Sequence, residues 1–238
     1  MAVIFENPQY VHVLRMLNSM PARDKTFRAL QFVAKLLSWH LFYGGSSLST
    51  VNKWKKLESN ISFSRKLFSI GKVLDYICKV YFDSLKLQNP LSGNKSALPT
   101  ISFTKDVAFA GYATAELIGW FNKTELMPCS HSKQISTIGK QCLAVALLSS
   151  CLAGCYELQQ NSKKIKSATQ EASEKDSTSL QTLQKERKEI LFFALQNALD
   201  ATIPLAELDI LKVNDGFVAA AGITTSLMSV YKTWIGSY

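Results

Sequence analysis

The sequence is poor in the residues and motifs from which catalytic and metal-binding sites are usually built. It has three histidines among 238 residues, and none lies beside a pair of carboxylates or a recognisable nucleophile motif. The patterns GxSxG, GxxxxGK[ST] and HExxH do not occur, so hydrolase, nucleotide-binding and zinc-protease chemistry find no support. Cys129 and His131 are neighbours, but no second such pair completes a zinc site. We therefore expect no enzymatic activity, no cofactor and no metal ion.

Cysteine usage and the first residues argue against a secreted protein. The five cysteines are an odd number without regular spacing, unlike the framework of a disulfide-stapled domain. Three of them lie in one apolar stretch, where free cysteine behaves as a small hydrophobic residue. The beginning of the sequence lacks a basic start, a long apolar run and a small-residue cleavage site. We expect no secretory signal peptide.

Acidic residues are the scarcer charge, and the basic excess is localised. The chain has 27 Lys and Arg against 18 Asp and Glu, and residues 1–88 hold 13 of the basic residues but 5 of the acidic ones. Such a local excess of positive charge suggests nucleic acid or an anionic membrane surface as a partner, or simply a basic surface exposed to solvent. The basic residues alternate with Phe and Leu along helical patterns, and no zinc-finger, helix-turn-helix or RNA-binding signature occurs. We therefore expect no nucleic-acid partner and favour the membrane.

Nearly all of the chain has the periodicity of α-helix, which predicts an all-α fold. Residues 89–99 contain two prolines and a glycine and predict a loop. This loop divides a basic, amphipathic N-terminal region, residues 1–88, from a hydrophobic helical region, residues 89–238. Residues 159–179 are rich in Gln, Ser, Lys and Glu, and we expect them to form a polar linker or a frayed helix.

Residues 60–86, NISFSRKLFSIGKVLDYICKVYFDSLK, contain no proline and combine apolar and basic residues. Apolar residues recur in helical steps of three and four, which predicts one continuous amphipathic helix. The residues that we expect to enter a membrane are Phe63, Leu67, Ile70, Leu74 and Ile77. The basic residues that we expect to face anionic lipid are Arg65, Lys66, Lys72 and Lys79. This arrangement is typical of an interfacial membrane helix. Packing on the chain's own helices, or on a partner helix, remains an alternative.

The basic side of residues 60–86 has no acidic counterpart that the sequence pattern reveals. Acidic residues elsewhere in the chain show no matching arc. We therefore expect these cations to face lipid headgroups rather than carboxylates of the same chain.

Three stretches are apolar enough to be considered as membrane spans. Residues 216–231 contain no charge, and residues 135–156 form an apolar segment of about 22 residues if Lys140 extends its ammonium to the interface. Residues 106–121 are apolar except for two acidic side chains. We expect two transmembrane helices, and three if residues 106–121 also span. Buried helices of a soluble bundle are the alternative.

Two further features of these hydrophobic helices bear on helix packing and on function. Gly222 and Ser226 form a small-xxx-small pair, which suits close helix packing. Glu116 is an ionisable residue in an apolar helix, and such a residue marks either a functional group or a polar helix end.

Two motifs and the C-terminal stretch together resemble one family, the peroxin-11 proteins, in a fungal-type form. The stretch SMPARDKTFRALQFVAKLL resembles the family's N-terminal signature, and SFSRKLFSIGKVLDY resembles its amphipathic segment. The residues that carry the two matches are Arg23, Asp24, Lys25, Arg28, Gln31 and Phe32, then Ser64, Arg65, Lys66, Gly71 and Lys72. The stretch GFVAAAGITTSLMSVYKTW resembles the closing hydrophobic helix of the family.

The excess of Lys and Arg in residues 1–88 predicts that the N-terminus lies in the cytosol. The resemblance implies an all-α protein of the peroxisomal membrane. It implies that the protein elongates and tubulates this membrane by inserting amphipathic helices and forming homo-oligomers, and so promotes peroxisome division and proliferation. The implied partners are anionic phospholipid, further copies of the chain, and a fission adaptor with its dynamin-related GTPase. An oligomeric pore for metabolites, with Glu116 inward, is the alternative function.

Overall fold

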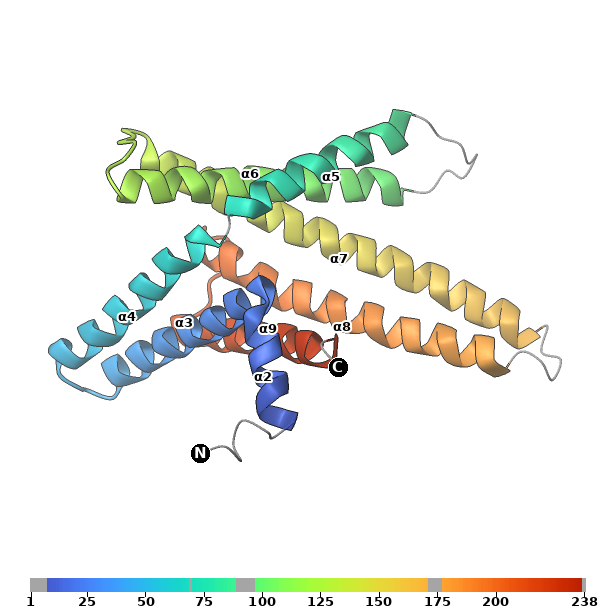
Figure 1. The fold of residues 1–238 in the computed structure, drawn as a ribbon, viewed down its shortest axis with the longest axis horizontal. Helices are drawn as coiled ribbons and strands as arrows, with labels where there is room; N and C mark the ends of the chain where they lie inside the picture. The colour runs from blue at the N-terminus through green and yellow to red at the C-terminus, as the bar shows by residue number, and fades with distance from the viewer. Residues whose placement is uncertain (1–7, 69, 89–96, 171–176, 237–238) are drawn as a thin grey trace.

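The computed structural model describes residues 8–68, 70–88, 97–170 and 177–236. These residues form helices without any strand, which confirms the predicted all-α class (Figure 1). The helices are α2 (Pro8–Asn18), α3 (Met20–Tyr43), α4 (Leu48–Leu67), α5 (Ile70–Gln88), α6 (Leu98–Lys123), α7 (Ser132–Gln170), α8 (Ser177–Glu207) and α9 (Asp215–Gly236).

Helix α3 begins and ends at residues whose chemistry favours those positions. The Ser19 hydroxyl accepts the backbone N–H of Ala22, and Pro21 lies in the first turn, where its missing N–H is not needed. At the other end, the N–H of Gly44 donates to the carbonyl of His40 at 2.9 Å. Gly45 follows with φ of 74°, a conformation that glycine adopts without steric cost. Serine, proline and glycine thus mark the two ends of α3.

The helices pack in a nearly consecutive order, and α9 closes the arrangement. Helix α6 packs on α7, α7 on α8 and α8 on α9, and α9 also packs on α3. Helices α3 and α4 form a hairpin, and α5 packs on α6. In Figure 1 the long α7–α8 pair extends to one side, away from the α3–α4 hairpin. Helices from before and after residue 88 thus pack on each other.

The tightest part of the core lies where α9 meets α3 and α8. Phe32, Ile203 and Val218 form a buried cluster. Gly222 faces the ring of Phe32 so closely that a Cβ atom added there would overlap the ring. Ser226 is fully buried, and its hydroxyl donates to the carbonyl of Gly222 at 2.6 Å. The small-residue pair therefore lies at a close helix contact within the chain.

The structure corrects one expectation about continuity and decides between the alternatives of another. Residues 60–86 do not form one helix, because α4 ends at Leu67 and α5 begins at Ile70. The change of direction lets α5 pack along α6, which one straight helix would not do. The predicted linker, residues 159–179, is helical as far as Gln170, and residues 171–176 lie outside the described part of the chain. Lys, Glu and Gln favour helix, and the side-chain amide of Asn161 donates to the carbonyl of Leu183 on α8.

The structure offers fewer candidate membrane spans than the two or three expected. Within the described residues, Ser132–Thr169 is the one helix long and apolar enough to cross a membrane. This helix contains residues 135–156, and 33% of its most apolar stretch is buried inside the protein. Residues 216–231 belong to α9 instead, where one side of the helix is buried against α3 and α8.

Gly222→Ala is expected to lower the free energy of unfolding by about 1–3 kcal/mol, because the new methyl group would displace Phe32 within a packed core. Denaturant titration of the purified protein in detergent, followed by circular dichroism, measures this change. Gly71→Ala is the matched control, since nothing lies within 4 Å of a Cβ atom at Gly71. Alanine favours helix over glycine, so the control should be neutral or stabilising by up to about 1 kcal/mol. Equal losses in both variants would contradict the close contact.

Candidate membrane-binding surface

Helix α5 has two apolar sides, and one of them is covered by α6. Val73, Tyr76 and Val80 are half-buried at helical spacing. The ring of Tyr76 stacks on Phe109 of α6 with 5.2 Å between ring centroids. This side anchors α5 to the rest of the protein.

The other apolar side of α5 is open to the surroundings. We call it the exposed apolar face, and it consists of Ile70, Leu74, Ile77, Tyr81 and Phe82. Leu74 is 67% exposed and Ile77 54% exposed. Contiguous apolar side chains of this size are rarely left exposed in a soluble monomer, and they indicate an interaction site.

The five residues predicted to insert into a membrane fall into two groups. Leu67, Ile70, Leu74 and Ile77 are exposed, as the interfacial interpretation requires. Phe63 is half-buried, and its ring stacks on Trp120 of α6 with 6.0 Å between centroids. Four of the five side chains are therefore available at the surface, and the fifth holds α4 against α6.

Two of the predicted basic residues converge on one buried carboxylate. Asp24, on α3, is 4% exposed. Arg65 donates from Nε to Asp24 Oδ1 at 3.0 Å, and Lys72 donates from Nζ to Asp24 Oδ2 at 2.9 Å. Arg65 also donates from Nη1 to Oε1 of Gln31 at 2.7 Å. The two sequence motifs that resemble the peroxin-11 family are thus joined by an ion-pair cluster.

The other two basic residues have different surroundings. Lys66 pairs with Glu116 of α6 at 3.4 Å. Lys79 is exposed, and its ammonium lies 5.1 Å from the centroid of the Tyr76 ring. The expectation that the basic side has no acidic counterpart is therefore wrong for three of the four residues. Asp24 was missed because one carboxylate between Arg23 and Lys25 forms no charge pattern of its own.

Burial and neighbouring charges shift the pKa values of Asp24 and of the adjacent Lys25. Burial alone would raise the pKa of Asp24, but the nearby cations of Arg65 and Lys72 outweigh it and lower this pKa below its ordinary value. Burial lowers the pKa of the neighbouring Lys25 to about 8, and the adjacent Arg28 acts in the same direction. Asp24 is therefore ionised at neutral pH.

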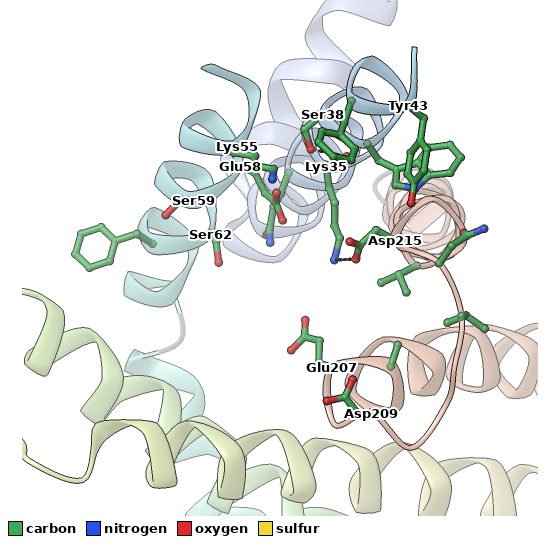
Figure 2. Close-up of a pocket in the computed structure, with 18 of the residues that line it drawn as sticks. Lys35, Ser38, Tyr43, Lys55, Glu58, Ser59, Ser62, Glu207, Asp209 and Asp215 are labelled. Carbon is green, nitrogen blue, oxygen red and sulfur yellow. Dashed lines mark hydrogen bonds and ion pairs between the residues drawn. The ribbon is translucent and has the colours of Figure 1, made fainter. Parts of the chain in front are cut away.

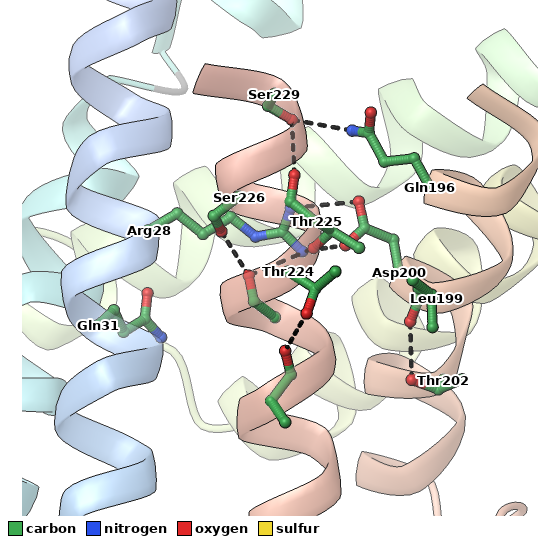
Figure 3. Close-up of polar contacts among 12 residues, drawn as sticks. Arg28, Gln31, Gln196, Leu199, Asp200, Thr202, Thr224, Thr225, Ser226 and Ser229 are labelled. Atoms are coloured by element: carbon green, nitrogen blue, oxygen red, sulfur yellow. Dashed lines mark hydrogen bonds and ion pairs between the residues drawn. The ribbon is translucent and has the colours of Figure 1, made fainter. Parts of the chain in front are cut away.

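A second ion pair fixes the other side of the first motif. Figure 3 shows Arg28 reaching from α3 past α9 to Asp200 on α8. Both guanidinium Nη atoms donate to the carboxylate, one of them at 3.2 Å, and both side chains are largely buried. A bidentate pair of this kind fixes orientation as well as distance. Next to it, Gln196 of α8 donates to the Ser229 hydroxyl of α9 at 2.9 Å.

A cleft of about 940 Å³ opens between α3, α4 and the connection from α8 to α9 (Figure 2). Lys35 pairs with Asp215 across it at 3.3 Å, and Glu207 at its edge pairs with Lys140 at 3.2 Å. Burial raises the pKa of Glu58 in the cleft, and Lys35 partly opposes this effect. Its charged groups are thus largely neutralised within the chain. Among the described residues, no three His, Cys, Asp or Glu side chains cluster as metal ligands would.

The Asp24 ion pairs predict an acid-sensitive contribution to stability. The pKa of Asp24 in the folded protein lies below its unfolded value of about 3.9. The carboxylate therefore stabilises the fold above the unfolded pKa, and this stabilisation is lost as the pH falls through the folded pKa. We expect the difference in unfolding free energy between wild type and Asp24→Asn to be constant from about pH 5 to neutral pH and to shrink below about pH 4. Denaturant titrations across this range measure it, and a difference that persists unchanged to about pH 3 would contradict the pairing.

Comparison with known proteins places these features in a family. The sequence model of peroxisomal biogenesis factor 11 matches residues 10–234. Similar proteins include Peroxisomal membrane protein PMP30A of Candida boidinii, which is 23% identical over 96% of this chain and 95% of its own length.

Relatives from more distant organisms align over a similar length. Peroxisomal membrane protein 11A of Homo sapiens is 25% identical over 90% of this chain and 92% of its own length. Peroxisomal membrane protein PMP27 of Saccharomyces cerevisiae is 22% identical over 96% of this chain and 95% of its own length. No solved structure matches the chain. Because the family match covers nearly the whole sequence, this chain belongs to the peroxisomal biogenesis factor 11 family.

Proposed function

We propose that this chain is a protein of the peroxisomal membrane that elongates and tubulates it, and thereby promotes peroxisome division and proliferation. The observation that carries the mechanism is the exposed apolar face of α5, which the fold leaves uncovered while the opposite side of α5 packs on α6. The relatives named above are peroxisomal membrane proteins by name, which supports the location.

The membrane surface accounts for both the apolar and the basic character of this region. Full burial of a Leu or Ile side chain contributes about 1.5–3 kcal/mol, so several such residues drive α5 into the boundary between headgroups and acyl chains. Each Lys or Arg close to an anionic surface contributes about 1 kcal/mol. Residues 1–88 carry most of the net positive charge of the chain, and the exposed apolar face belongs to this part of the sequence.

Insertion into one leaflet supplies the mechanical step. A helix that lies in the headgroup region of one leaflet expands the area of that leaflet relative to the other, and the bilayer bends to relieve the difference. In a homo-oligomer, the inserted helices of several copies would together bend the bilayer along a tubule. Homo-oligomerisation is therefore part of the proposal. Helix α7 is the candidate anchor that keeps each copy in the bilayer.

The orientation and the protein partners complete the proposal. The basic N-terminal region faces the cytosol, as the excess of Lys and Arg near membrane segments favours. A fission adaptor and a dynamin-related GTPase then meet the protein on the cytosolic side, where the elongated membrane is divided.

Replacing Leu74 and Ile77 together by serine is expected to weaken binding of the full-length protein to anionic vesicles by at least about tenfold. Tubulation of the same vesicles, seen by electron microscopy, should disappear. Both side chains are exposed, so the loss of their apolar surface acts on membrane binding rather than on the protein core. Co-flotation with vesicles measures the binding.

The matched control replaces Leu126 and Met127 by serine in the connection between α6 and α7. These side chains are 67% and 65% exposed, so the control removes similar apolar surface away from α5. The control should bind and tubulate as the wild type does. Equal behaviour of the two double variants would show that the exposed apolar face of α5 is not the inserting surface.

A further inference from the structure

Two cations beside the start of the exposed apolar face are not free in the folded protein. Arg65 lies in the last turn of α4 and Lys72 in the first turn of α5, and in the sequence the exposed Leu67 and Ile70 lie between them. Both cations are bound to Asp24, at 3.0 Å and 2.9 Å. A membrane that receives the apolar residues therefore meets two cations that already have a carboxylate partner.

The contacts around Asp24 have the form of an anion-binding site. Two cationic donors from different helices approach the two oxygens of one oxyanion, and Gln31 orients the guanidinium of Arg65 from the side. Guanidinium and ammonium groups bind carboxylate and phosphate oxygens by the same charge-assisted hydrogen bonds. The donors reach the surface, because the side chains of Arg65 and Lys72 are 21% and 42% exposed. A phosphate can thus approach them from outside, whereas Asp24 approaches them from the core.

We propose that Arg65 and Lys72 form a lipid-phosphate site that Asp24 occupies until an anionic membrane displaces it. Asp24 is then an internal competitor that sets how much anionic lipid is needed before α5 inserts. This inference rests on the proposed function and adds its regulation. The site selects a phosphate-bearing anionic surface, because a neutral membrane offers no net charge to offset the loss of the Asp24 contacts.

Lys72 and Lys79 have different partners in the folded protein. Lys79 is exposed on the same helix and lies over the Tyr76 ring, and its positive charge also acts on the nearby carboxylate of Asp106. Lys72 differs from it in being hydrogen-bonded to a buried carboxylate. Lys72 contributes to binding only after it leaves Asp24. Two lysines separated by two helical turns should therefore contribute differently in the wild type and equally once Asp24 is neutral.

The first test uses the full-length chain and vesicles of phosphatidylcholine with rising fractions of phosphatidylserine. Asp24→Asn should bind more tightly than wild type at low phosphatidylserine, by about fivefold for each freed cation. Asp200→Asn is the matched control, because it removes one buried carboxylate and the same charge but frees Arg28, which lies on α3. The control should need as much phosphatidylserine as the wild type. Equal gains in both variants would mean that loosening of the fold, and not release of the site, increases binding.

The second test starts in the wild-type background, so its deciding comparison needs no change at Asp24. In the wild-type background, Lys79→Gln should weaken vesicle binding by about fivefold, and Lys72→Gln should weaken it clearly less. In the Asp24→Asn background the two changes should have equal effects, which a double-mutant cycle measures directly. Equal effects of both lysine changes in the wild type would overturn the occupied-site inference.

The outcomes separate this inference from the function on which it rests. If the Leu74 and Ile77 variant loses binding while Asp24→Asn binds as wild type does, the wedge mechanism stands and the competitor role of Asp24 is wrong. If wild type binds no vesicle at any phosphatidylserine fraction, both are wrong. Binding that rises equally on purely phosphatidylcholine vesicles would also overturn the inference, since phosphatidylcholine carries phosphate but no net charge and the gain would then not need an anionic surface.

Discussion

One buried carboxylate, Asp24, determines how the amphipathic part of this protein is held. Its two oxygens take one cation from the end of α4 and one from the start of α5. A buried charge without a partner is strongly destabilising, so the folded protein keeps both helices close to α3. The position of α5, and with it the orientation of its exposed apolar face, depends on this pairing together with the Tyr76 contact to α6.

The same part of α3 also contacts the C-terminal helices α8 and α9. Asp24 and Gln31 lie on one strip of the helix and hold Arg65, while Arg28 and Phe32 lie on the adjacent strip. Arg28 binds Asp200 of α8 (Figure 3), and Phe32 packs against Gly222 of α9. The first family-like motif therefore contacts both the N-terminal and the C-terminal helices of the chain.

Much of the fold could be predicted from the sequence, because local periodicity and end signals are local properties. The all-α class, the bounds of α3 and the apolar positions on α5 all followed from residue spacing and from serine, proline and glycine at the ends. The division of residues 60–86 at Leu67 could not be predicted, since the apolar steps run on without interruption. For residues 159–170 the sequence left a polar linker and a frayed helix as alternatives, because polar composition suggests solvent exposure but does not prevent a helix. Packing on α8 decides for the helix.

The sequence by itself determined which sides of the helices are apolar, where positive charge concentrates, and which family the motifs resemble. Tertiary structure alone decided which apolar side of α5 is covered by α6 and which stays exposed. It also decided that Arg65 and Lys72, which stand 41 and 48 positions after Asp24, share that residue's carboxylate. Periodicity reports the composition of a helix side, whereas its neighbour is set by long-range packing that no local pattern encodes. The exposed apolar face is therefore a property of the folded chain.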